Sequence, residues 1–262
     1  MKMKTHNIIL TCLFGIAIFA ACKKVPLSNT ETFLPSDKAF IRIALYSPGT
    51  PAVMIKADSV KINGNNTSGN GGLFPSTSNF PDYASVPAGS TLKLSLANTG
   101  TQNDSIVLFN GKLDLESGKF YSVTLADTGI KRTAFSIEDK FVMQKDSFLN
   151  VRLINAMVGS TLTLLRIDSA TATDVVRDTL ARNIPYKGTS GFIPVNTNTF
   201  TTRPIRIRIV STINGRSYGT PQISPQTFAS SSRRSITFYA FGFEDGLVPP
   251  FLPGLSANIT NQ

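Results

Sequence analysis

Short runs of alternating apolar and polar residues dominate the chain from Ala39 onward. The clearest runs place an apolar side chain at every second position, as in Ile41, Ile43 and Leu45, in Leu92, Leu94 and Leu96, and in Ile205, Ile207 and Ile209. A period of two puts each triplet on one face of a β-strand, so each predicts a strand with a buried face. No stretch after Val25 carries an apolar stripe of helical period and length. We therefore expect an all-β protein.

The strand pattern occurs twice along the chain. Residues 40–45 correspond to 150–155, residues 83–86 to 192–195, and residues 122–124 to 235–237. Each copy holds about six or seven strand-like runs separated by turn signals such as Asn-Gly, which is typical of an immunoglobulin-like sandwich. The sequence thus predicts two tandem antiparallel β-sandwich domains, at residues 37–145 and 146–246.

The last residues, 247–262, are rich in proline and in apolar side chains. Proline cannot donate to a sheet ladder, so this segment is not expected to form a central strand. We predict a Pro-rich tail that either packs across the second domain or docks a partner protein.

The first residues carry a targeting signal. Lys2 and Lys4 precede an apolar run that ends in Phe19-Ala20-Ala21-Cys22, which resembles the lipobox of bacterial lipoproteins. The alternative is a transmembrane anchor, but a fourteen-residue helix spans only about 21 Å of a hydrocarbon core about 30 Å thick. We predict a signal peptide at residues 1–21, lipidation of Cys22, and a tether at residues 22–36 that contains Pro26 and Pro35.

Cleavage before Cys22 also removes the reactive side chains of the chain. His6 is the one histidine, Cys12 is the only other cysteine, and the chain has no tryptophan. Histidine-dependent triads, cysteine nucleophiles and zinc or copper sites with His or Cys ligands are therefore excluded. The chemical options that remain are carboxylate pairs, Ser-Lys arrangements and oxygen-only calcium sites. Because the commonest general bases and metal ligands are missing, we expect no enzyme activity, no cofactor and no metal.

The processed chain is moderately basic. Lys2 and Lys4 leave with the leader, so 24 of the 26 Lys and Arg residues remain against 16 Asp and Glu residues. This balance suits acidic glycans, lipid phosphates or an anionic bilayer, or it only keeps the protein soluble. Arg203, Arg206 and Arg208 form the candidate anion-binding or glycan-binding stripe, because Arg206 and Arg208 alternate with the apolar residues of their strand. The alternative is a charged solvent face.

Three further sets of residues have a chemical and a structural interpretation. Asp114 and Glu116 could act as a carboxylate pair or lie on a solvated face before the Ser117-Gly118 turn. Glu244-Asp245-Gly246 resembles part of a calcium loop but lacks the spaced ligands, which favours a turn. The tyrosines could stack on sugars or belong to the core and its rim; they are Tyr83, Tyr121, Tyr186, Tyr218 and Tyr239.

One family has a similar sequence pattern. The segments Phe40-Ile41-Arg42-Ile43, Ser47-Pro48-Gly49-Thr50-Pro51-Ala52-Val53 and Val60-Lys61-Ile62-Asn63-Gly64 resemble the opening of the domain of unknown function 4397 family. The second copy keeps Val151-Arg152-Leu153 but has Met157-Val158-Gly159-Ser160 in place of the Ser-Pro segment. The resemblance implies β-sandwich modules on envelope lipoproteins of Bacteroidota, and it carries no catalytic residues.

These observations lead to a functional prediction. We expect a non-catalytic lipoprotein of the outer membrane that serves as a binding or scaffold module for an envelope protein assembly or an acidic glycan, with no nucleic-acid partner. Lys23 and Lys24 replace the acidic run that surface export requires in that phylum, which favours the periplasmic face. The alternatives are an adhesin or fimbrial-type structural subunit and a carboxylate-based glycan hydrolase.

Overall fold

The computed structural model describes twelve segments of the chain. They are residues 37–46, 53–62, 72–74, 83–96, 107–127, 132–142, 148–168, 175–196, 205–219, 222–223, 234–247 and 252–261. All regular elements in these segments are β-strands, and Asp37–Gln262 form one compact unit, so the all-β prediction is confirmed. Within this part of the chain, no helix has the length and apolar character that crossing a bilayer requires. The predicted leader, the tether and the predicted boundary at residue 145 lie outside the described residues.

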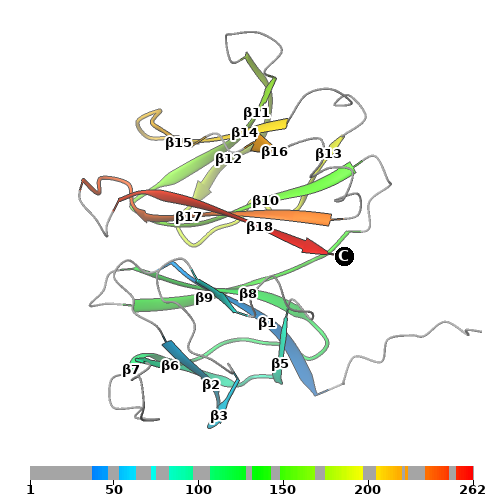
Figure 1. Cartoon of the computed structure of the whole chain (residues 1–262), viewed down its shortest axis with the longest axis vertical. Helices are drawn as coiled ribbons and strands as arrows, with labels where there is room; N and C mark the ends of the chain where they lie inside the picture. Colours follow the sequence, from blue (N-terminus) through cyan, green and yellow to red (C-terminus); the bar gives the residue numbers. More distant parts are fainter. Residues whose placement is uncertain are drawn as a thin grey trace, which may run out of the picture. The chain divides into compact units, whose positions relative to one another are not determined.

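The first half of the unit is a sandwich of two sheets (Figure 1). Its inner sheet has the order β4-β1-β8-β9, with β5 also paired to β1; these are β4 (Gly72–Phe74), β1 (Lys38–Leu45), β8 (Phe120–Asp127), β9 (Arg132–Glu138) and β5 (Ala84–Pro87). Its outer sheet has the order β3-β2-β6-β7, from β3 (Val60–Lys61), β2 (Val53–Ala57), β6 (Thr91–Leu96) and β7 (Val107–Lys112).

The second half repeats this plan. Its inner sheet has the order β13-β10-β17-β18, from β13 (Ile193–Asn196), β10 (Phe148–Val158), β17 (Arg234–Phe243) and β18 (Gly254–Asn261). Its outer sheet has the order β12-β11-β14-β15, with β16 on β14; these are β12 (Val175–Pro185), β11 (Thr161–Asp168), β14 (Ile205–Ser211), β15 (Ser217–Gly219) and β16 (Gln222–Ile223). The prediction of two tandem sandwiches is confirmed.

Each inner sheet is mixed, where the sequence predicted antiparallel pairing alone. β1 pairs with β8, and β10 with β17, in parallel, while all other pairs are antiparallel. A parallel pair needs a long crossover. In each half the chain builds its outer sheet between these two strands, which supplies that crossover.

The duplication is visible in the register of these parallel pairs. Arg42 lies opposite Ser122, and Arg152 lies opposite Thr237. Ser122 therefore corresponds in space to Thr237. The alignment of the two sequence copies had matched Ser122 with Ser235, which lies two positions earlier. A shift of two residues keeps every side chain on its predicted face, because the strand period is two.

Each half buries an apolar core between its two sheets. In the first half, Ile41, Ile43 and Leu45 of β1 are fully buried against the outer sheet, and in the second half Val151 and Leu153 of β10 take these places. Complete burial of one such side chain contributes about 1.5–3 kcal/mol. Of the other predicted triplets, Leu92 and Leu94 belong to the core of the first half, and Ile207 and Ile209 to that of the second.

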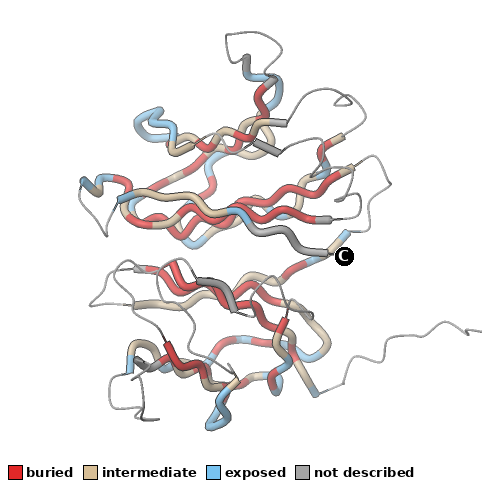
Figure 2. Tube along the Cα trace, viewed as in Figure 1, coloured by how far each residue is buried: buried red, intermediate tan, exposed pale blue. Residues whose placement is uncertain are grey.

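The inner sheets are buried on both faces. Arg42 and Ala44 of β1, and Asn150, Arg152 and Ile154 of β10, alternate with the core residues and are also at most 1% exposed. Figure 2 shows β10 and β17 as buried over most of their length, next to the inner sheet of the first half. The second face of each inner sheet is covered by the other half.

The C-terminal residues end in a strand of the second sandwich. β18 pairs antiparallel with β17 from Gly254 to Asn261, and Leu255 packs against the core. The sandwich therefore extends beyond residue 246, the predicted end of the second domain. The prolines that favoured a tail all precede this strand, and β18 lies at the edge of its sheet, where the chain needs only one pairing partner. Of the two alternatives for the tail, packing is confirmed for Gly254–Asn261.

Candidate functional site

The predicted anion-binding stripe is partly described by the structure. Arg206 and Arg208 lie half-buried on one face of β14, and Ile207 and Ile209 are fully buried on the other, as the alternation predicted. Arg208 lies opposite Leu165 of β11, so this face belongs to the outer sheet of the second half. Arg203 and Cys22, the predicted lipidation residue, lie outside the described residues.

The carboxylates considered for catalysis have structural surroundings. Asp114 and Glu116 are exposed and alternate with buried Leu113 and Leu115, and Glu116 forms an ion pair with Lys119 at 2.8 Å. This arrangement confirms the solvated face before the predicted turn. Among the described residues, no group of three or more His, Cys, Asp or Glu side chains could hold a metal ion.

Glu244 and Asp245 form a turn after β17, as predicted, and the Glu244 side chain is buried. Its carboxylate oxygen Oε1 accepts hydrogen bonds from the Ser211 hydroxyl, from Asn214 Nδ2 at 3.3 Å and from the Tyr218 hydroxyl at 3.0 Å. Burial and the hydrogen bond to Glu244 raise the pKa of Tyr218, which keeps its hydroxyl protonated as a donor. Glu244 therefore ties the turn after β14 to the end of β17.

The sequence did not reveal a polar cluster between the two halves. Asp139 follows β9, and its side chain is fully buried between Arg42 and Arg152. Arg152 Nη1 donates a hydrogen bond to Asp139 Oδ1, while Asp139 Oδ2 accepts one from the Tyr83 hydroxyl at 2.6 Å and one from the Ser122 hydroxyl at 2.9 Å. One carboxylate thus joins strands of both halves.

The two arginines are held differently. Arg42 Nη2 lies 4.0 Å from Asp139 Oδ2 and donates a hydrogen bond to the Tyr83 hydroxyl at 2.9 Å. The Tyr83 hydroxyl in turn donates to Asp139, so Tyr83 bridges Arg42 and Asp139. Burial, and then the Asp139 carboxylate, raise the pKa of Tyr83 above its usual range, so the hydroxyl remains a donor. Arg152 Nη2 donates to Ser122 at 2.9 Å and to Thr237 at 3.1 Å. Arg152 therefore bonds to both halves.

Aromatic rings cover these guanidinium groups. The Arg42 guanidinium lies 4.8 Å from the ring centroid of Tyr83, and the Arg152 guanidinium lies 4.3 Å from that of Phe192. Tyr83 and Phe192 occupy corresponding places in the two sequence copies, as the first residues of segments 83–86 and 192–195. Each half therefore contributes one Arg-aromatic pair. Phe141, which follows Asp139 closely, stacks on Phe192 with centroids 5.6 Å apart.

An apolar cluster completes the contact between the halves. Ala44 and Tyr46 of the first half pack with Ile154 and Tyr239 of the second. The ring centroids of Tyr46 and Tyr239 are 5.0 Å apart, and those of Tyr46 and Phe241 are 4.7 Å apart. Tyr83, Tyr121 and Tyr239 are all buried, which confirms the core interpretation for these three tyrosines.

Comparisons with known proteins show little similarity. A scan against protein-family models finds no matching family, and a search of curated proteins finds no match, so the resemblance to the domain of unknown function 4397 family stays a prediction. Similar solved structures include a candidate cell adhesion protein of Bacteroides uniformis, with 8% identity over 86% of this chain and 97% of that chain and a TM-score of 0.25. They also include the tip fimbrial protein Mfa3 of Porphyromonas gingivalis, with 9% identity over 86% of this chain and 100% of that chain and a TM-score of 0.22. TM-scores this low carry no argument about function.

The buried cluster predicts a large effect of one neutral substitution. Asp139→Asn removes the carboxylate that pairs with both Arg42 and Arg152, and breaking a buried pair in this way costs about 3–5 kcal/mol. We expect the free energy of unfolding, measured by urea denaturation at pH 7, to fall by that amount.

Asp178→Asn is the matched control. Asp178 pairs with Arg166 at 3.7 Å, but its side chain is 53% exposed, and such a pair contributes at most about 1 kcal/mol. Equal losses in the two variants would show that Asp139 is no more important to stability than a surface carboxylate.

Proposed function

We propose that the protein is a non-catalytic lipoprotein of the outer membrane, anchored through Cys22, whose two sandwiches form one rigid module that binds an acidic glycan or an envelope protein assembly. The observation that carries the proposal is the buried contact between the halves through Asp139, Arg42 and Arg152. This contact keeps the two sandwiches in a fixed arrangement, which lowers the entropic cost of binding a partner across both.

The chemistry of the processed chain supports a binding role. Among the residues that the structure describes, the buried carboxylates are Asp139 and Glu244, and each accepts hydrogen bonds from several donors that hold the fold together. The outward-facing arginines of β14 are suited to contact carboxylate or sulfate groups, since a guanidinium binds such anions in a planar, bidentate manner. We place the protein on the periplasmic face, because Lys23 and Lys24 follow the anchor.

The anchor predicts where the protein is found. Cys22→Ser removes the thiol that would be lipidated, so the variant should move from the membrane fraction to the soluble fraction and lose incorporation of labelled palmitate. The test compares both readouts with those of the natural chain. Membrane retention of the variant together with normal labelling would contradict the assignment of Cys22.

The arginine face predicts retention on a polyanion. The double variant Arg206→Glu and Arg208→Glu reverses two charges on one face of β14, so its elution from heparin-agarose should shift to clearly lower salt. Lys93→Glu together with Lys112→Glu serves as the control, because these charges lie on the outer sheet of the first half. An equal shift in both variants would show that retention follows net charge alone, and the proposed binding face would be wrong.

A further inference from the structure

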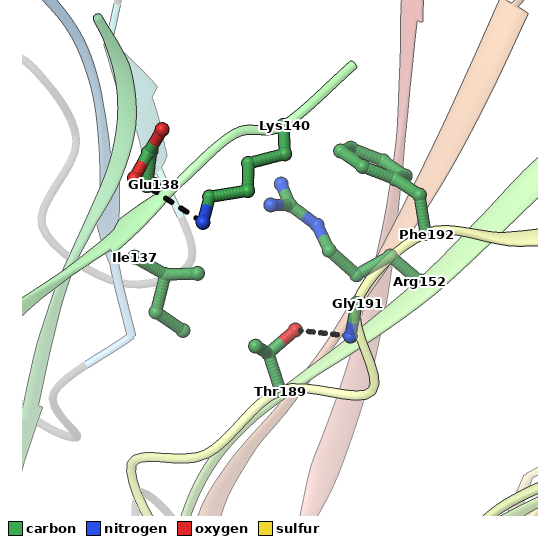
Figure 3. A pocket seen from close by; sticks show the side chains of 7 residues that line it. All are labelled: Ile137, Glu138, Lys140, Arg152, Thr189, Gly191 and Phe192. Atoms are coloured by element: carbon green, nitrogen blue, oxygen red, sulfur yellow. Dashed lines mark hydrogen bonds and ion pairs between the residues drawn. The ribbon is translucent and has the colours of Figure 1, made fainter. Parts of the chain in front are cut away.

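A cavity opens beside the buried cluster, between the two halves. Its volume is about 300 Å³, at the lower end of the range for small-molecule sites, and its walls come from three segments. The segments are the end of β9 with the residues after it, strand β10, and the loop between β12 and β13. The lining residues are Ile137, Glu138, Lys140, Arg152, Thr189, Gly191 and Phe192 (Figure 3).

The loop wall of the cavity is fixed against β10. Thr189 Oγ1 donates to the Leu153 carbonyl oxygen at 3.0 Å, and the Leu153 amide donates to Ser190 Oγ at 2.9 Å. The Gly191 amide donates to Thr189 Oγ1 at 3.2 Å, and Gly191 has a φ of 68°, which favours glycine. The wall is therefore preformed, which lowers the entropic cost of binding a ligand.

The charges around the cavity favour a single negative charge. The charged lining residues and the ion pairs that connect to them comprise four cationic side chains and three carboxylates; these are Arg42, Lys119, Lys140 and Arg152, with Glu116, Glu138 and Asp139. The surplus is one positive charge. A dianion, such as the doubly charged form of phosphate, would exceed this surplus and would meet Glu138 in the wall, whereas a monoanion would balance it.

Two cationic side chains line the cavity, and of these Lys140 is exposed whereas Arg152 is buried in the wall. Figure 3 shows the Arg152 guanidinium between the Lys140 side chain and the Phe192 ring. Lys140 is 78% exposed and pairs with Glu138 at 3.7 Å, but Glu138 also pairs with Lys119 at 3.6 Å. Lys140 can therefore turn to a ligand while Glu138 keeps a cationic partner. The remaining wall presents the side chains of Ile137 and Phe192, which suit an apolar body.

We propose that this cavity binds a small monocarboxylate with a compact apolar body, whose carboxylate pairs with Lys140 and is attracted by the charge of the buried Arg152. The proposal rests on the binding role proposed above and assigns it a second site, distinct from the arginine face of β14. Because the walls come from both halves, the bound ligand stabilises the contact between them.

Isothermal titration calorimetry tests the proposal with defined probes. The protein is the processed chain with Cys22→Ser, and the probe is cyclohexanecarboxylate at pH 7. We expect saturable binding, at least about tenfold weaker binding of the neutral cyclohexanecarboxamide, and weaker binding of glucuronate, which has the same charge but a polar body. Lys140→Glu should lower the affinity about tenfold or more.

Two controls separate this site from folding and from the polyanion face. Lys61→Glu reverses a lysine on the outer sheet of the first half and should leave the affinity unchanged, as should the Arg206 and Arg208 double variant. Circular dichroism of Lys140→Glu should match that of the parent, since Lys140 is exposed. Equal affinity for acid and amide, tighter binding of phosphate, or no effect of Lys140→Glu would overturn the proposal, whatever the outcome on heparin.

Discussion

The buried carboxylate of Asp139 is the constraint on which the arrangement of the two halves depends. Two guanidinium groups are removed from water beside it, and such burial is costly unless charge and hydrogen-bonding capacity are both satisfied. Asp139 supplies the charge, and Tyr83, Ser122 and Thr237 supply or accept the remaining hydrogen bonds. Because these groups come from both halves, any sliding of one sheet over the other would break several of these interactions at once.

Strand pairing within each half positions the residues of this contact. Parallel pairing places Arg42 beside Ser122, and Arg152 beside Thr237, so each half presents an arginine and a hydroxyl on the same face of its inner sheet. The apolar cluster around Tyr46 and Tyr239 then excludes water from the contact. The cavity next to Arg152 forms where the end of β9 and the residues after it meet strand β10 and the loop between β12 and β13. The proposed ligand site and the contact between the halves therefore share Arg152.

The sequence predicts the two sandwiches well, because period two and turn signals are local properties of the chain. The core triplets, the duplicated motif and the outward direction of Arg206 and Arg208 were all visible in it. The burial of Arg42 and Arg152 could not be predicted from the sequence. An arginine that alternates with isoleucines gives the same sequence pattern on a solvent face as in a contact between domains. The available signal was the recurrence of arginine at the same place in both copies.

Other features depend on long-range pairing, which periodicity does not encode. The parallel pairs join strands about 80 residues apart in sequence, and only the closed sandwich brings them together. β18 lies beyond three prolines that indicated a tail, although Gly254–Asn261 itself contains none. Asp139 lies between the charged residues Glu138 and Lys140, so the sequence pattern predicts an exposed segment although Asp139 is buried.

The most direct test of the central claim is differential scanning calorimetry of residues 22–262 with Cys22→Ser. If the Asp139 contact makes one cooperative unit of the two halves, unfolding should show a single transition whose calorimetric enthalpy equals its van't Hoff enthalpy. Two resolved transitions, or a calorimetric enthalpy near twice the van't Hoff value, would show that the sandwiches unfold independently and would contradict the account.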